Sequence, residues 1–301
     1  MNPTSFKNLG YRPPVQSDPK NWKLESTQPT VPFPIAVTTD ITPLKLPENI
    51  YMQYQVPDCV ENSVSFAQRY LAWKATGQIP NPCRRSLAIR TVAADGQPYE
   101  NGTSLEVALK LANTQGIGDA QYFSDDHTLD NPTFYGASIP ETEVASEPTF
   151  KIPSYAQVTD LSVNGLKNAI NQNGIVLIGI KVSDWWWTAP DGSTSWDATD
   201  ILPIRPIDAT HPEVSGHCVA LYGYDETYFY FMNWWSPRWG YQGHGWFGVN
   251  DVPEIYEAFV VGNFTKPTTP SPSPSVAQKA PVDNPIQQAI KEVETVIESL
   301  V

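Results

Sequence analysis

Two stretches of sequence, GHCVALYGY at 216–224 and NWWSPRWGYQG at 233–243, decide the fold of this chain. The first is a short apolar run that carries His217, and the second begins with Asn233. GIVLIGIKV at 174–182 precedes them, YFYFMNWW at 228–235 overlaps the second, and GWFGV at 245–249 follows. Short runs rich in β-branched and aromatic residues are typical of strands. The C-terminal half is therefore predicted to be a twisted antiparallel sheet.

The half that precedes these strands has helical signals instead. Asp58 can cap a helix that ends at Gly77, and a capping box, Thr103-x-x-Glu106, opens a second helix that stops at Gly116. A third helix is predicted around 162–173. The apolar stripe of the first helix consists of Val60, Val64, Ala67 and Leu71. Helices followed by strands predict an α+β architecture with a cleft between the two halves.

Composition restricts the class of protein. The chain has 301 residues, 41% of them hydrophobic, and a formal net charge of -13. A charge of this sign argues against nucleic-acid partners, because phosphate recognition depends on clustered Lys and Arg. Apolar runs are too short for membrane insertion, and no secretory signal is visible. With three unpatterned cysteines, we expect a cytoplasmic protein or part of a viral particle.

Proline marks the domain boundaries. Nine of the 29 prolines lie in residues 1–48 and six in 264–285. Residues 1–39 are predicted to form an extended, Pro-rich arm that lies on a globular body at 40–263, with a mobile leader as the alternative. Residues 264–285 are predicted to be a Pro/Ser/Thr linker.

An amphipathic helix is predicted after the linker, at 286–301. Its apolar residues recur with 4-3-4-3 spacing, and Asn284 and Pro285 suit its start. Such a stripe needs a partner, which could be a second copy of the chain, another protein or its own body.

Few residues offer chemistry. The four histidines and three cysteines lack metal-ligand spacing, and there is no P-loop or GxGxxG, so we expect no metal and no cofactor. Cys59 begins a predicted helix, where the dipole and free N–H groups favour a thiolate. Cys218 is predicted to be core, Cys83 a loop thiol, and His127, His211 and His244 surface or structural residues.

The residues around His217 and Asn233 resemble the papain family of cysteine peptidases. That family has a His-Ala-Val strand ending in Gly-Tyr, then Asn-Ser-Trp-Gly-x-x-Trp-Gly-x-x-Gly. The matching residues are His217, Val219, Gly223, Tyr224, Asn233, Trp235, Trp239, Gly240 and Gly243. Short bacterial and bacteriophage members are the most similar, with GTSL at 102–105 and NGIV at 173–176 in their register. The resemblance covers about residues 40–262.

The same resemblance extends upstream. Gln53 lies six residues before Cys59, the family's distance from its glutamine to its nucleophile, and Gln55 is a nearby rival. Some positions differ, but no reacting group is lost. Val60 follows the cysteine in place of Trp, Tyr54 and Ser236 replace glycines, and Val56 stands where the family has a disulfide cysteine.

This resemblance implies a two-lobed papain-like fold and a role for each of these groups. Cys59 would be the nucleophile, His217 the acid and base, Asn233 the residue that orients His217, and Gln53 an oxyanion donor. Trp235 would shield the His217–Asn233 bond. Gly102, Trp235, Trp185 and Trp186 are substrate-binding candidates, although the indoles could instead cover the β half.

Three functions fit the sequence. The first is a cysteine endopeptidase acting on peptide or protein substrates through a thioester. The second is a papain-like structural or interaction protein, such as a phage particle component, with vestigial or incidental activity. The third is a peptidoglycan-cleaving amidase.

Overall fold

A computed structural model describes residues 9–262 except 17, 28–35 and 196. Residues 266–301 form a unit separate from 1–265. The predicted linker at 264–285 and the predicted helix at 286–301 lie outside the described residues. All that follows concerns the described part of the first unit.

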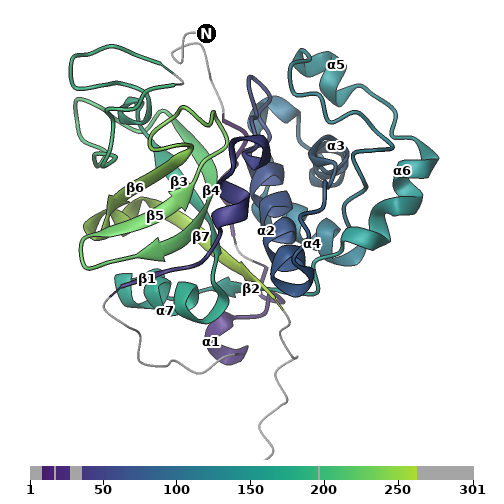
Figure 1. Cartoon of the computed structure of the whole chain (residues 1–301), viewed down its shortest axis with the longest axis horizontal. Helices are drawn as coiled ribbons and strands as arrows, with labels where there is room; N and C mark the ends of the chain where they lie inside the picture. Colours follow the sequence, from purple (N-terminus) through teal and green to yellow (C-terminus); the bar gives the residue numbers. More distant parts are fainter. Residues whose placement is uncertain (1–8, 17, 28–35, 196, 263–301) are drawn as a thin grey trace, which may run out of the picture. The chain divides into compact units, whose positions relative to one another are not determined.

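One lobe is built from helices (Figure 1). Its long helix, α2, ends as predicted at Gly77, which adopts a left-handed φ of 72° and donates its N–H to the Trp73 carbonyl. The apolar face of α2 packs in a core shared with α3 and α4. The helices of this lobe are α2 (Cys59–Thr76), α3 (Arg84–Asp95), α4 (Leu105–Thr114), α5 (Asn131–Tyr135) and α6 (Glu141–Ser146).

Two features of this lobe differ from the sequence prediction. Ser104, not Thr103, caps α4 by accepting from the Val107 N–H at 3.5 Å. Thr103 is instead engaged by the Gly10 carbonyl and by Glu61, so a tertiary contact overrides the capping box. Helix α3 has no counterpart in the prediction, because its buried Arg84 and Arg85 hide its apolar face.

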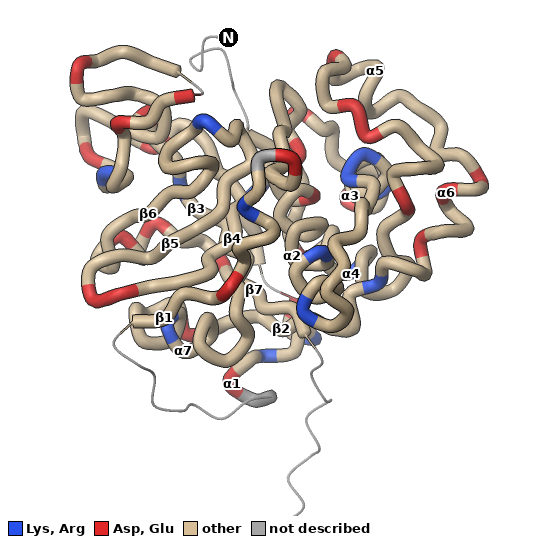
Figure 2. Tube along the Cα trace, viewed as in Figure 1, with Lys and Arg blue, Asp and Glu red and all other residues tan. Residues whose placement is uncertain are grey.

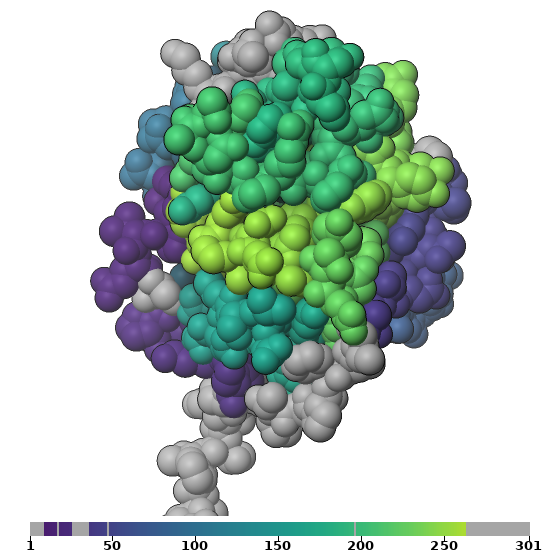
Figure 3. Space-filling model, turned by 90° about the vertical axis from the view of Figure 1, so that its left-hand side faces the viewer, coloured from purple at the N-terminus to yellow at the C-terminus, as the bar shows by residue number. Residues whose placement is uncertain are grey.

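The second lobe is an antiparallel sheet of seven strands in the order β2-β7-β3-β4-β5-β6, with β1 paired to β4. Helix α7 (Val163–Asn173), predicted around 162–173 and capped by Ser162, packs on it. Figure 3 shows β7 on one face of this lobe, between α7 and the segment that leads into β4. The strands are β1 (Val37–Thr38), β2 (Tyr155–Val158), β3 (Val176–Val182), β4 (Ser215–Tyr224), β5 (Tyr228–Met232), β6 (His244–Gly248) and β7 (Ile255–Val261).

Trp234 joins the two lobes. It is fully buried, and its indole lies 5.2 Å from the ring of Phe66 on α2. Its Nε1 donates to Ser63 Oγ at 2.9 Å and to the Cys218 carbonyl at 2.8 Å. One side chain therefore fixes the start of α2 against β4.

The described part of the N-terminal segment contacts both lobes. Its short helix α1 (Leu24–Thr27) lies beside β2, where Gln157 donates its N–H to the Trp22 carbonyl at 2.7 Å. Further upstream, Tyr11 pairs with Thr103 at the helical lobe in a parallel bridge. Residues 9–12 lie where the two lobes meet.

Candidate functional site

Cys59 is the first residue of α2 and is fully buried. The Ser63 hydroxyl donates to the Cys59 carbonyl at 2.9 Å. The backbone of Cys218, the residue after His217, hydrogen-bonds to the Cys59 thiol. The thiol of α2 therefore lies against β4 beside His217.

His217 is held by Asn233. Its Nε2 lies 2.8 Å from Asn233 Oδ1, and Asn233 is fixed in turn by donating its own N–H to the Gly243 carbonyl at 3.0 Å. The Trp234 N–H also donates to Asn233 Oδ1, so this oxygen accepts twice. An oxygen that only accepts requires the proton on Nε2, which leaves Nδ1 with a lone pair for a second group. His217 Nδ1 has no hydrogen-bond partner among the described residues.

Trp235 covers this histidine. Its ring stacks on the imidazole at a centroid distance of 5.0 Å, and it is 5% exposed. Trp186 meets the same imidazole edge-on at 5.8 Å. The His217–Asn233 hydrogen bond therefore lies beneath aromatic rings that exclude water.

Gln53 is bound to the residue that follows Asn233. Its N–H donates to the Trp234 carbonyl at 2.8 Å, and its Nε2 donates to the carbonyls of Val56 and Leu9, both at 3.1 Å. Gln53 is 1% exposed, whereas its sequence rival Gln55 lies on the surface. The structure therefore brings together Gln53, Cys59, His217 and Asn233.

Burial keeps the thiol and the imidazole uncharged in this state. It raises the pKa of Cys59 well above its usual range, and the neighbouring charge of Asp58 adds to the rise, although the hydrogen bond from the Cys218 backbone acts in the opposite direction. Burial also lowers the pKa of His217 to about 4, although the hydrogen bond to Asn233 acts in the opposite direction. Desolvation disfavours the charged form of each group, so a thiolate–imidazolium pair requires that water reach the site.

Besides the aromatic rings over His217, the N-terminal segment covers the site. The Leu9 carbonyl accepts from Gln53, and the Leu9 N–H donates to Ser215 Oγ at 3.1 Å. Gly10 approaches the backbone before the thiol so closely that an added Cβ would lie 2.3 Å from the Pro57 carbonyl carbon. Residues 9–11 thus cover the site, and nothing in the sequence besides the apolar character of Tyr11 indicated this.

Tyr11 fills a pocket in the β lobe. Its hydroxyl donates to Glu257 Oε1 on β7 at 3.1 Å, and Gly179 and Gly216 leave room for the ring. A Cβ added to Gly179 would meet the ring at 2.0 Å. Burial raises the pKa of Glu257 to about 7. Glu257 did not emerge from the sequence, because β7 comes 40 residues after His217 and lacks a recognisable motif.

Gly102 was predicted to let a substrate backbone approach closely. In the structure, the backbone of the N-terminal segment at Gly10 occupies this position. Gly102 adopts a φ of 72°, and an added Cβ would lie 2.9 Å from the Gly10 carbonyl carbon. The next residue, Thr103, donates its N–H to the Gly10 carbonyl at 2.9 Å and accepts from the Arg12 N–H at 3.0 Å. The backbone at Gly102 and Thr103 therefore pairs with the extended N-terminal segment.

The two other indole candidates, Trp186 and Trp185, have different surroundings. Trp186 is 1% exposed and packs among Phe231, Trp235 and Trp239, so it has no surface for a substrate and this prediction is corrected. Trp185 is half-buried, with its ring 3.5 Å from that of His211 and the Arg205 guanidinium 3.2 Å from its centroid. It contacts neither Cys59 nor His217 through any of these interactions.

The remaining cysteines and histidines differ in burial. Cys83 is fully buried at the start of α3, rather than in an open loop, and burial raises its pKa to about 12. Cys218 is core, and burial raises its pKa. His127 and His244 are buried, at 3% and 4% exposed, whereas His211 is partly exposed.

Glu61, one turn into α2, is a buried acid whose pKa is raised to about 8, mainly by burial and then by Asp58. A raised acid pKa means that the folded state holds a proton that the unfolded chain loses above about 4.5. The free energy of unfolding should therefore fall as pH rises from 5 to 8. Glu61→Gln should reduce that slope, with Glu257, whose pKa burial raises to about 7, supplying part of the remainder. The substitution should also stabilise the fold at pH 7 by about 1–3 kcal/mol in urea unfolding.

The matched control for this prediction is Glu141→Gln, a substitution at an exposed glutamate on α6. It should leave the pH dependence unchanged. A Glu61→Gln protein with the wild-type slope would contradict the assignment of that slope to Glu61.

Charges are dispersed in the part of the chain that the structure describes. Figure 2 shows acidic residues on both lobes with Lys and Arg between them. Among the described residues, no three potential ligands gather as a metal site would require. None of the helices described there has the length and hydrophobicity to span a bilayer.

Solved structures with this fold are cysteine proteases. Xylellain, a cysteine protease from Xylella fastidiosa, is 18% identical, with a TM-score of 0.69 over 84% of this chain and 94% of that one. Digestive procathepsin L 3 of Tenebrio molitor is 15% identical, with a TM-score of 0.62 over 86% and 77%. The cysteine protease and lectin-like domains of Cwp84 from Clostridium difficile are 14% identical, with a TM-score of 0.63 over 88% and 57%. No family model and no curated protein matches the sequence.

Proposed function

Since the chain has the fold of the papain-like cysteine proteases, we propose that it is a cysteine endopeptidase with Cys59 as its nucleophile. The observation that carries the proposal is the orientation of His217. Its Nε2 is bound to Asn233 Oδ1, and its Nδ1 is left for a proton from a thiol that already contacts the next residue of β4.

In the proposed reaction, Cys59 transfers its proton to His217 Nδ1, and the thiolate attacks the carbonyl carbon of a peptide bond. His217 then gives the proton to the leaving amine as the C–N bond breaks, and a thioester remains. Water, deprotonated by His217, hydrolyses the thioester and restores the thiol. Asn233 keeps the imidazole in the required tautomer throughout.

The developing oxyanion would be bound by Gln53 Nε2 and the Cys59 N–H. The support is that Gln53 Nε2 already donates to a carbonyl oxygen, that of Leu9. Loss of one such donor typically lowers the rate by ~10²–10³-fold. Since Leu9 to Tyr11 occupy this place, the segment must leave before a substrate enters.

The proposal is tested by alkylation of the folded, full-length chain with iodoacetamide, followed by peptide mapping. All three thiols are fully buried, so labelling is compared in chains with and without Tyr11→Ala. Loosening of the covering segment should speed modification of Cys59 and leave Cys83 and Cys218 spared. Modification should slow sharply in His217→Ala, and cleavage of casein or a quenched fluorescent peptide library should disappear in Cys59→Ala. Labelling of Cys59 that does not depend on His217 would overturn the proposal.

The other two functions predict different results. A structural protein would cleave nothing, even with Tyr11→Ala loosening the covering segment. An amidase would clear bacterial cell walls in zymograms and leave casein intact.

A further inference from the structure

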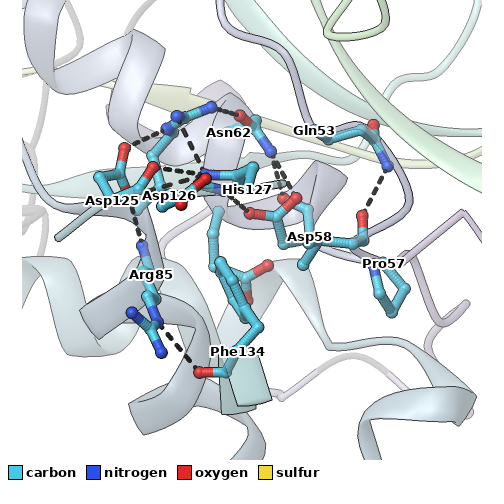
Figure 4. Close-up of polar contacts among 12 residues, drawn as sticks. Gln53, Pro57, Asp58, Asn62, Arg85, Asp125, Asp126, His127 and Phe134 are labelled. Carbon is cyan, nitrogen blue, oxygen red and sulfur yellow. Dashed lines mark hydrogen bonds and ion pairs between the residues drawn. The ribbon is translucent and has the colours of Figure 1, made fainter. Parts of the chain in front are cut away.

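Asp58, the residue immediately before Cys59, is at the N-cap position of α2 but does not cap the helix. Its carboxylate makes no hydrogen bond to the first-turn N–H groups, which is the usual use of aspartate at this position. It is fully buried, and Figure 4 shows it directed toward Asn62 and His127. A buried carboxylate must be paired, so its partners decide where it points.

Both carboxylate oxygens are occupied. Asn62 Nδ2 donates to Oδ1 at 2.8 Å, and His127 Nε2 lies 2.6 Å from Oδ2. Each partner offers an N–H, so the site requires an acceptor at both positions. An asparagine at position 58 would turn an N–H toward either Asn62 or His127, so aspartate fits where its amide does not.

His127 is itself rigidly held. Its Nδ1 lies 2.9 Å from the Asp125 carbonyl and 3.1 Å from Arg84 Nη2, and its ring meets Phe134 edge-on at 4.9 Å. Nδ1 can donate to the carbonyl or accept from the guanidinium. A neutral ring that accepts from Arg84 at Nδ1 carries its proton on Nε2 and donates it to Asp58. A ring that donates from Nδ1 to the Asp125 carbonyl donates to Asp58 as well only as the imidazolium, with a proton on each nitrogen.

The groups facing His127 come from three elements. Asp58 and Asn62 belong to the start of α2, and Arg84 to α3, where it donates to Asn62 Oδ1 and Asp125 Oδ2, both at 2.7 Å. Asp125 lies on the loop that precedes α5, with its other oxygen bound by the Arg85 N–H at 2.8 Å. The network thus connects the start of the nucleophile's helix to the body of the lobe.

The Asp58 main chain belongs to the turn that presents the thiol. Its N–H donates to the Val56 carbonyl at 2.9 Å, the same carbonyl that accepts from Gln53 Nε2. Tyr135 Oη donates to the Pro57 carbonyl at 3.2 Å and steadies the turn from the other side. A rotation of this turn would move the Cys59 N–H relative to Gln53, the two donors assigned to the oxyanion.

We propose that His127 is a positioning residue that, by holding the Asp58 carboxylate, fixes the turn before Cys59 and keeps a negative charge away from the thiolate. This inference rests on the proposed function. Without His127, the carboxylate is free to fold over the first turn of α2, where it would cancel the dipole that favours a thiolate. The charge of Asp58 already adds to the raised pKa of Cys59, although burial and other neighbours contribute more.

The test compares His127→Gln with His127→Asn in the full-length chain carrying Tyr11→Ala. A glutamine amide reaches the position of Nε2 and can still donate to Asp58, whereas an asparagine amide reaches only that of Nδ1. We expect His127→Asn to lower kcat by ~10–100-fold with little change in KM, and His127→Gln to restore most of it. Asp58→Asn should resemble His127→Asn, and combining the two should cost little more than either alone.

A second readout separates positioning from folding. The acid limb of the pH profile for iodoacetamide alkylation of Cys59 should move to higher pH in His127→Asn and stay near its original position in His127→Gln. Equal kcat and equal alkylation profiles in the two variants would overturn the inference, whether both are fast or both are slow. Alkylation needs no peptide cleavage, so this comparison remains decisive even if His217→Ala shows that the proposed function is wrong.

Discussion

Tyr11→Ala is expected to speed both alkylation of Cys59 and peptide cleavage by the full-length chain, by ~10²–10³-fold. Tyr11 is 1% exposed and fills the pocket that ends at Glu257. Truncation of a buried aromatic side chain costs about 3–5 kcal/mol, and each 1.4 kcal/mol is a tenfold change in an equilibrium. The population in which the segment has left the site should therefore rise by about that factor, until the open form predominates.

The measurement is the rate of iodoacetamide modification of Cys59, with intact mass to exclude clipping of the segment. Tyr11→Phe keeps the ring but loses the hydroxyl that donates to Glu257, so it should have a smaller effect. Tyr122→Ala, at a tyrosine that is 46% exposed, should change nothing. If Tyr11→Ala reacts no faster than wild type while its melting temperature is unchanged, residues 9–11 do not limit access to the thiol.

What the sequence could predict followed from local patterns. The strands β3, β4, β5 and β6 were found because each is a short run rich in β-branched and aromatic residues, and α2 because Gly77 ends an apolar stripe. The papain-like fold is confirmed by the solved structures. The structure places His217 Nε2 within hydrogen-bonding distance of Asn233 Oδ1.

What the sequence could not predict depends on distant partners. Helix α3 was missed because Arg84 looks exposed until Asp125, 41 positions away, pairs with it at 2.7 Å. Thr103 was predicted to be a helix cap, but its hydroxyl donates to the Gly10 carbonyl and to Glu61 Oε1. Leu9 to Tyr11 carry no motif, and their place over Cys59 depends on a pocket whose floor, Glu257, lies 246 residues further along.

His217→Ala, in the chain opened by Tyr11→Ala, is expected to lower kcat/KM by ~10³–10⁴-fold, the scale of losing a group that acts as a unit with the nucleophile. The alanine removes both the acceptor for the thiol proton and the donor for the leaving amine. It also leaves a cavity bounded by Trp235 and the Asn233 amide. Free imidazole added to the assay should enter this cavity and restore part of the alkylation rate of Cys59.

The control is His244→Ala, which removes another buried histidine, one whose pKa burial lowers to about 3. Both substitutions empty a buried imidazole site in the same sheet, so both should lower the melting temperature. His217→Ala alone should lose the rate and regain part of it with imidazole, because only His217 has a nitrogen free beside the thiol and an asparagine to orient it. Equal loss of activity in the two variants, without rescue, would assign the effect to stability and remove His217 from the reaction.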